Sequence, residues 1–290
     1  LTQDHARLHH RAPLVGVQLH DGVHRRGHDQ DAATQRVARA LTDDFTQVSH
    51  LVPMLSLENS YDSDDLNDFD RKIKELAKTA NVEYCVEPKF DGSSIALVYE
   101  NDMLVRAATR GDGAVGEDIT NNAKALASIP LSASFSKYGI QRIEIRGEVI
   151  IQRDIFEKMN AERKLKGEKE FQNPRNTASG SLRLKDPSEA AARKLEAILY
   201  HVSFAEDAEG KNLLAGKLES HYHTIEILHE CGFKTPIKEL RKCESVEDIQ
   251  AFLTMWEEKR NTFNIDTDGM VIKVNSLALQ QRLGATSHHP

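Results

Sequence analysis

Hydrophobic and polar positions follow a regular pattern only from about residue 50 onward. Earlier in the chain the periodicity is poor, and Gly16, Gly22 and Gly27 interrupt any helix. The pattern predicts a helix over 63–80, because apolar residues recur there at helical spacing, at Leu66, Phe69, Ile73, Leu76 and Ala77. Helical spacing predicts further helices over 153–166, 189–194, 220–231 and 246–261.

Other segments carry the pattern of β-strands. Short apolar or alternating runs predict strands over 84–86, 94–99, 104–108, 143–151 and 270–274. Asn101 and Asp102 are the expected turn of a hairpin. Strands joined by hairpins, with helices inserted between them, indicate an α+β fold of antiparallel sheets flanked by helices. They do not indicate a doubly wound parallel sheet.

Composition changes abruptly along the chain. No Lys occurs before Lys72, no Glu before Glu58 and no Tyr before Tyr61, whereas six of the 13 histidines lie within the first 28 residues. We therefore expect an N-terminal segment over 1–45 and a main domain over 46–290.

Overall composition limits the classes of function. With 290 residues, 39% of them apolar and 29% charged, the chain is typical of a soluble globular protein. It has no apolar run long enough for a membrane span and no secretion signal, so we expect a cytoplasmic protein. The net charge of −7 argues against a general DNA clamp, because phosphate neutralisation requires a basic surface.

The strongest chemical candidate is Lys89, in the run Glu87-Pro88-Lys89-Phe90-Asp91-Gly92. A lysine acts as a nucleophile where its surroundings favour the neutral amine. Asp91 could orient that amine or hold a metal, and Gly92 lets the backbone approach a ligand. Taken alone, however, such a run more often holds a solvated surface lysine.

Neighbouring runs strengthen the assignment. Arg110, followed by Gly111-Asp112-Gly113, suits contact with a phosphate or ribose. Glu148 places a carboxylate on a predicted strand beside a glycine. Lys273 lies on an apolar strand after Asp268-Gly269, and because buried lysines need a partner, an anionic phosphate is a good candidate.

In this order the motifs resemble those of nucleotidyltransferases that carry AMP on a lysine. More narrowly, the chain resembles the adenylation domain of bacterial NAD⁺-dependent DNA ligases. The blocks particular to that family lie at 53–57, 87–89, 108–113, 116–118, 173–176, 179–183 and 283–290, and the similarity runs from about Thr34 to the last residue.

The resemblance implies a nucleotidyltransferase fold with a small N-terminal helical segment, and a role for each matching residue. Lys89 would attack the α-phosphate of NAD⁺, release nicotinamide mononucleotide (NMN) and form lysyl-AMP. The nucleotide would be bound by Ser56, Leu57, Glu87, Arg110, Glu148, Tyr200, Asp268 and Lys273. Arg175 and Arg183 would face DNA phosphates, and Mg²⁺ or Mn²⁺ would bind near Asp91 and Glu148. The plainer alternatives are a core aromatic for Tyr200, solvated or structural arginines, and a turn residue for Asp268.

The chain departs from the family at both ends. Residues 1–33 occupy the position of the helical subdomain that binds NMN, yet they contain no Tyr. The family's next block would begin after Pro290, followed by an oligonucleotide-binding barrel, a zinc finger and other modules. We therefore expect a fragment that at most self-adenylates, without the zinc of the absent modules. The full-length enzyme would be a monomeric, nucleoid-associated bacterial protein that acts on nicked double-stranded DNA and binds no membrane.

Two alternatives remain open from the sequence. An ATP-dependent ligase or capping-type enzyme shares the Lys89 and Lys273 motifs, although the blocks at 173–176 and 179–183 speak against it. An inert nucleotide-binding module belongs to a different functional class. Covalent addition of AMP from NAD⁺ but not from ATP distinguishes the leading interpretation from both.

Overall fold

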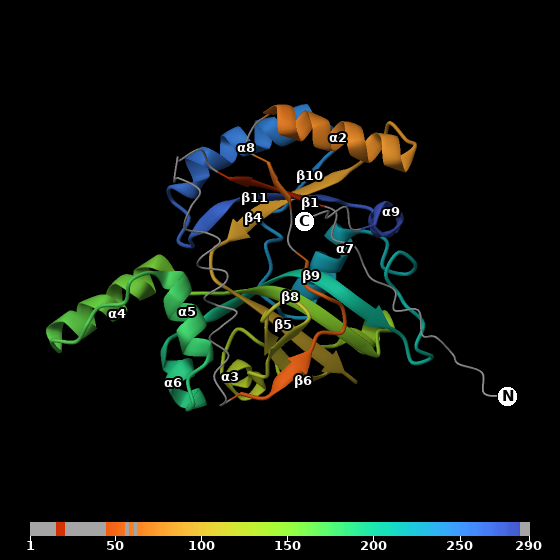
Figure 1. The fold of residues 1–290 in the computed structure, drawn as a ribbon. Helices are drawn as coiled ribbons and strands as arrows, with labels where there is room; N and C mark the ends of the chain where they lie inside the picture. Colours follow the sequence, from red (N-terminus) through yellow and green to blue (C-terminus); the bar gives the residue numbers. More distant parts are fainter. Residues whose placement is uncertain (1–15, 21–44, 56–57, 61–62, 285–290) are drawn as a thin grey trace.

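The computed structural model describes residues 16–20, 45–55, 58–60 and 63–284, which build two main β-sheets with helices around them (Figure 1). The five-stranded sheet has the order β10-β4-β11-β1-β3, with bounds Arg241–Cys243, Tyr84–Phe90, Thr267–Val274, Gly16–His20 and Glu58–Ser60. The four-stranded sheet has the order β6-β5-β8-β9, with bounds Met103–Thr109, Ser93–Glu100, Arg142–Ile150 and Glu196–Glu206. A separate small pair joins β2 (Gln47–Ser49) to β7 (Val115–Glu117).

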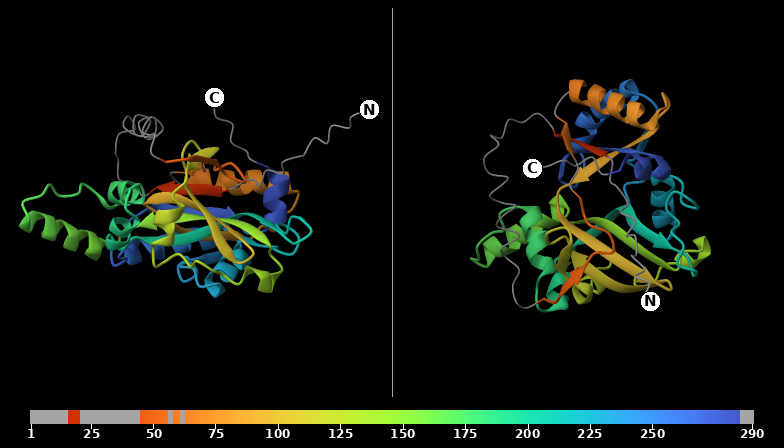
Figure 2. Two further views of the ribbon diagram at one scale, coloured as in Figure 1. Left: turned by 90° about the horizontal axis from the view of Figure 1, so that it is seen from below. Right: turned by 45° about the vertical axis from the view of Figure 1, so that its right-hand side comes forward.

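The helices have the bounds α2 Ser63–Ala77, α3 Thr120–Lys124, α4 Arg153–Leu165, α5 Pro174–Leu182, α6 Pro187–Ala192, α7 His221–Glu230, α8 Val246–Arg260 and α9 Leu277–Leu283, with a 3₁₀ turn at Phe135–Tyr138. The five predicted helices are present as α2, α4, α6, α7 and α8, whereas α3, α5 and α9 were not predicted. Several helices begin at a side-chain cap: Asn173 accepts from the Asn176 amide at α5, and Ser220 from the His223 amide at α7. Helix α4 extends away from the sheets (Figure 2), and none of its side chains is fully buried, although Ile155, Phe156 and Met159 pack partly buried against a core.

One hydrophobic core lies between the five-stranded sheet and the helices α2 and α8 (Figure 1). Alternate residues of β4 and β11 point into it, because side chains of a strand alternate between its faces. Its members include Leu66, Ile73, Tyr84, Val86, Trp256, Met270, Ile272 and Val274. Glu87, Lys89 and Lys273 therefore lie on the opposite face of β4 and β11.

A second core covers one face of the four-stranded sheet. Ile143, Ile145 and Val149 of β8 point into it, whereas Glu144, Arg146 and Glu148 alternate with them as buried polar residues. The polar faces of the two sheets meet where Lys273 Nζ of β11 donates to the backbone carbonyl of Tyr200 on β9, at 3.1 Å. The sheets thus bring polar side chains from distant segments together.

The predicted α+β class is confirmed, since all strand pairs among the described residues are antiparallel except β1 with β3. Asn101 and Asp102 form the predicted turn, both with left-handed backbone (φ 51° and 66°). The expected strand over 84–86 is too short, because β4 continues to Phe90 and holds Lys89 inside a strand. Strand β9 was not predicted.

Of the N-terminal segment, the structure describes Gly16–His20, which pairs with β11 as strand β1, and the last residue, Phe45. The expected helical segment otherwise lies outside the described residues. No helix in the described part of the chain is long and apolar enough to cross a membrane.

Candidate active site

Lys89 lies near the end of β4, directly across from Gly269 of β11. Gly269, with φ 148°, has no Cβ and so adds no side chain beside the lysine. A register shift between Thr267 and Gly269 takes Asp268 out of the regular pairing. Its Oδ2 lies 3.5 Å from Lys89 Nζ, and the lysine side chain is 24% exposed. The predicted nucleophile is therefore accessible and has a carboxylate beside it.

Glu87 and Lys273 form a buried ion pair next to Lys89. Lys273 Nζ contacts Glu87 Oε1 and lies 5.3 Å from the centre of the Tyr200 ring. The sequence predicted that buried Lys273 needs an anionic partner, and the partner here is a carboxylate of the same site. Because both charges are desolvated, each depends on the other.

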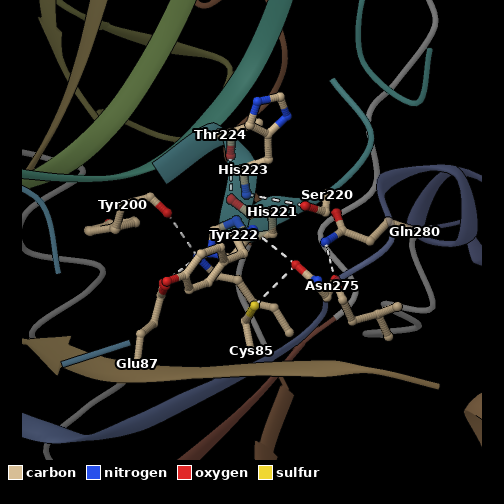
Figure 3. Close-up of polar contacts among 12 residues, drawn as sticks. Cys85, Glu87, Tyr200, Ser220, His221, Tyr222, His223, Thr224, Asn275 and Gln280 are labelled. Carbon is tan, nitrogen blue, oxygen red and sulfur yellow. Dashed lines mark hydrogen bonds and ion pairs between the residues drawn. The ribbon is translucent and has the colours of Figure 1, made fainter. Parts of the chain in front are cut away.

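His221 is a member of this cluster that sequence reasoning missed. Its Nε2 lies 2.9 Å from Glu87 Oε2, and the ring is fully buried at the start of α7 (Figure 3). No local motif marks it, since its partner is 134 residues away. The surrounding pattern, a serine cap followed by a helix, indicates only a helix start.

Glu148 of β8 and Tyr200 of β9 form the part of the site that lies on the four-stranded sheet. Glu148 Oε2 accepts from Ser94 Oγ at 3.1 Å and from the Tyr200 hydroxyl at 3.2 Å. Burial raises the pKa of Glu148 to about 7, although these hydrogen bonds favour the ionised form. Glu148 therefore keeps its proton to a higher pH than an ordinary carboxyl does.

Replacing Glu148 with glutamine should make stability less dependent on pH. The folded-state pKa lies above the ordinary value of 4.5, so the protonated carboxyl stabilises the fold at low pH. That contribution is lost as pH rises from 4.5 through 7. Relative to Glu148→Gln, the natural chain should lose on the order of 3 kcal/mol of unfolding free energy by about pH 8. Urea unfolding of both chains across this range measures the difference, and parallel curves would contradict it.

Asp91 and Arg175 join the site at the beginning of α5. Arg175 Nη1 lies 3.2 Å from Asp91 Oδ1, and the arginine side chain is 60% exposed. Burial raises the pKa of Asp91, and the neighbouring charge of Asp268 raises it further. No group of three or more His, Cys, Asp or Glu side chains in the described ranges is arranged to hold a metal ion.

Arg110 lies just past the end of β6 and is exposed. Its field lowers the pKa of Tyr200, although burial of the phenol outweighs it and the net shift is upward. The loop after it packs on the segment at 50–54: the Met54 amide donates to the Gly113 carbonyl at 2.7 Å. Gly113 has φ 93°, and a Cβ there would lie 2.7 Å from the Met54 carbonyl oxygen. Ser56 and Leu57, which follow this segment, lie outside the described residues.

A second buried ion pair, also missed from the sequence, holds the same segment. Arg146 Nη2 lies 2.7 Å from Glu144 Oε1, and the two side chains are 4% and 0% exposed. Glu144 Oε2 accepts from the Leu51 amide at 2.8 Å, and Arg146 donates to the carbonyls of Val52 and Pro53. The pair thereby anchors the backbone that leads to residues 56 and 57.

Arg183 is held differently from Arg175. At the end of α5 it forms an ion pair with Glu117 of β7, whose side chain is fully buried, and it donates to Ser179 Oγ at 3.2 Å. Glu117 itself was not among the predicted residues. The two arginines predicted to contact nucleic acid thus lie at opposite ends of α5, and Arg183 is the more restrained of the two.

Comparison with known proteins places this geometry in a family. The model described as "NAD-dependent DNA ligase adenylation domain" matches residues 42–290. Among curated proteins, a DNA ligase of Persephonella marina is 54% identical over 90% of the chain, and one of Aquifex aeolicus is 50% identical over the same share. The chain covers 36% and 35% of those two proteins, so it spans little more than a third of their length.

Solved structures give a weaker likeness. A chain described as "mycobacterial DNA ligase D complexed with ATP and MES" aligns over 67% of this chain and 49% of its own, with a TM-score of 0.39 and 13% identity.

Proposed function

The chain belongs to the family of NAD-dependent DNA ligase adenylation domains, and from this premise we propose that Lys89 takes AMP from NAD⁺. The observation that carries the proposal is the register of β4 and β11. It places Lys89 across from Gly269 and brings Glu87 and Lys273 onto the same face of the sheet. The nucleophile and the buried cation of Lys273 thus lie on one face of the sheet, beside a residue without a side chain. In-line attack on a phosphate requires a nucleophile and a cation positioned together in this way.

Each step of the proposed reaction uses groups already described. Lys89 Nζ, as the neutral amine, attacks the α-phosphorus of NAD⁺ and forms a P–N bond. The bond to the NMN phosphate oxygen breaks, NMN leaves with the electron pair, and the amine proton passes to solvent. Lys273 neutralises the charge that builds on the phosphate. Asp268 holds the amine in place from 3.5 Å.

The nucleoside half would lie between the two sheets. The Tyr200 ring offers a stacking surface for adenine, and the Glu87 carboxylate offers a hydrogen-bond acceptor. Glu148 would contact the ribose, and Arg110 the ribose or the leaving group. Ser56 and Leu57 are proposed to complete the pocket.

A divalent cation fits the carboxylates on this face. Mg²⁺ usually takes one or two protein carboxylates together with substrate phosphates, and the charge of Asp91 is near enough to raise the pKa of Glu148. Mg²⁺ or Mn²⁺ bound there would neutralise phosphate charge. In the full-length enzyme, AMP would pass to the 5′-phosphate of nicked DNA. The exposed Arg175 would contact the DNA backbone, and Arg183 would do so after breaking its ion pair with Glu117.

The donor gives the direct test. After incubation with NAD⁺ and Mg²⁺, the intact mass of the chain should increase by one AMP, whereas ATP should give no increase. An increase with ATP alone would identify an ATP-dependent nucleotidyltransferase. No increase with either donor would indicate an inert nucleotide-binding module. Both results would overturn the proposal.

A further inference from the structure

Both oxygens of the Glu87 carboxylate are occupied inside the protein. Oε1 contacts Lys273 Nζ, and Oε2 lies 2.9 Å from His221 Nε2. The three side chains are almost completely buried and come from β4, β11 and α7. Figure 3 shows Glu87 pointing from its strand toward His221, with Tyr200 alongside. Nothing in the predicted division of roles assigns a role to His221.

His221 contacts Glu87 through the carboxylate oxygen that Lys273 does not use. Burial lowers the pKa of His221, and the charge of Lys273 lowers it further, so the ring is neutral. Its Nε2 then carries the proton and donates to the carboxylate. Lys273 Nζ, 3.5 Å from the same nitrogen, is also a donor and cannot bond to it. Burial alone would raise the pKa of Glu87, but Lys273 and His221 hold it below its ordinary value.

Asn275 fixes the position of His221. The backbone amide of His221 donates to the Asn275 carbonyl at 2.8 Å, and the Tyr222 amide donates to Asn275 Oδ1 at 2.9 Å (Figure 3). Asn275 follows β11 directly, two residues after Lys273. The start of α7 is therefore tied to the strand that carries the lysine, and the imidazole is placed by backbone geometry.

The single ammonium group of Lys273 is involved in two interactions that exclude each other. It pairs with Glu87 in this structure, and the proposed function assigns it to the α-phosphate. A buried carboxylate that loses its only donor is costly. With His221 still donating to Oε2, Glu87 keeps one hydrogen-bond donor and its orientation when Lys273 turns to the phosphate.

We propose that His221 is the positioning residue of the adenine subsite: it holds Glu87 so that the freed oxygen accepts the exocyclic amine of the purine. This inference rests on the proposed function. The only hydrogen-bond donor on neutral, N9-linked adenine is its 6-amino group, whereas hypoxanthine presents a 6-oxo acceptor. A fixed carboxylate therefore favours the amino purine, because a carbonyl facing it leaves two acceptors opposed.

The test compares NAD⁺ with nicotinamide hypoxanthine dinucleotide as donors for nucleotide transfer to Lys89. His221→Phe keeps a planar ring but removes the donor. It should raise the KM for NAD+ by roughly ten- to a hundredfold, the effect of one hydrogen bond to a charged group, with a smaller change in kcat. It should also reduce the preference for NAD⁺ over the hypoxanthine analogue. His221→Gln, whose amide nitrogen can replace Nε2, should restore most of both.

His223→Phe is the matched control, because His223 lies on the same helix turn but is exposed. It should behave like the natural chain. Should His221→Phe fail to fold, the smaller His221→Asn, whose amide is too short to reach Glu87, replaces it with the same expectation. A folded donor-free variant with unchanged KM and donor preference would overturn the inference, as would one that loses only stability. A natural chain that takes no AMP from NAD⁺ would instead overturn the proposed function.

Discussion

Lys89→Ala should abolish covalent addition of AMP while leaving the fold intact. The amine is the proposed nucleophile, and alanine removes it. The lysine side chain is 24% exposed and its ion pair with Asp268 spans 3.5 Å. Pairs of this kind contribute about 0–1 kcal/mol, so the unfolding free energy should change by no more than that.

Intact mass after incubation with NAD⁺ and Mg²⁺ measures the effect, and peptide mapping of the natural chain locates the AMP. Lys158→Ala is a suitable control, because Lys158 is 70% exposed on α4 and pairs only with Asp154 one turn away. It should accept AMP at the natural rate. AMP on the Lys89→Ala chain, or on a peptide without Lys89 in the natural chain, would show that the nucleophile lies elsewhere.

The sequence indicated candidate residues of the site, but it did not indicate which side chains these residues contact. Lys89 stood out because it lies in a compact motif after an apolar strand, Lys273 because it lies on an apolar strand, and Glu87 through the family resemblance. The sequence did not show that Glu87 compensates the charge of Lys273. That ion pair follows from the register of β4 against β11, two strands almost 190 residues apart in the sequence. For the same reason His221 escaped detection: only the tertiary fold brings α7 to Glu87.

One predicted strand was too short and another strand was not predicted. Strand β4 continues through Pro88 because β10 pairs only with Tyr84–Val86, so beyond that point one side of β4 is an edge that needs no amide. Strand β9 was missed because its mainly buried residues lie on both faces and give no clean alternation. In both cases the sheet environment decided the outcome.

Arg146 has a structural role that its motif does not reveal. In the sequence, the run Arg146-Gly147-Glu148 drew attention only for the carboxylate of Glu148. The sequence did not show that Glu144 and Arg146 pair with each other. They do so because the segment at 51–53 passes over β8 and presents backbone groups to both.

Glu144→Gln should therefore destabilise the fold strongly although it changes no volume. The glutamate is fully buried, and its Oε1 accepts from Arg146 and from Ser203 Oγ, at 2.7 and 2.8 Å. Glutamine leaves Arg146 as an uncompensated buried charge. The amide nitrogen of the glutamine would also face a hydrogen-bond donor in either orientation: Arg146 and Ser203 on one side, or the Leu51 amide on the other. Breaking a buried pair from one side costs about 3–5 kcal/mol, and we expect a loss of that size.

Glu100→Gln provides the matched control, because Glu100 pairs with Arg142 across neighbouring strands of the same sheet but at 41% and 36% exposure. Its loss should stay within about 1 kcal/mol. Urea midpoints at constant slope give both values. Adding Arg146→Met to Glu144→Gln should recover part of the loss, since the second change removes the stranded charge. A Glu144→Gln chain as stable as Glu100→Gln would mean that water or backbone movement satisfies Arg146, and that the pair does not anchor the segment leading to Ser56 and Leu57.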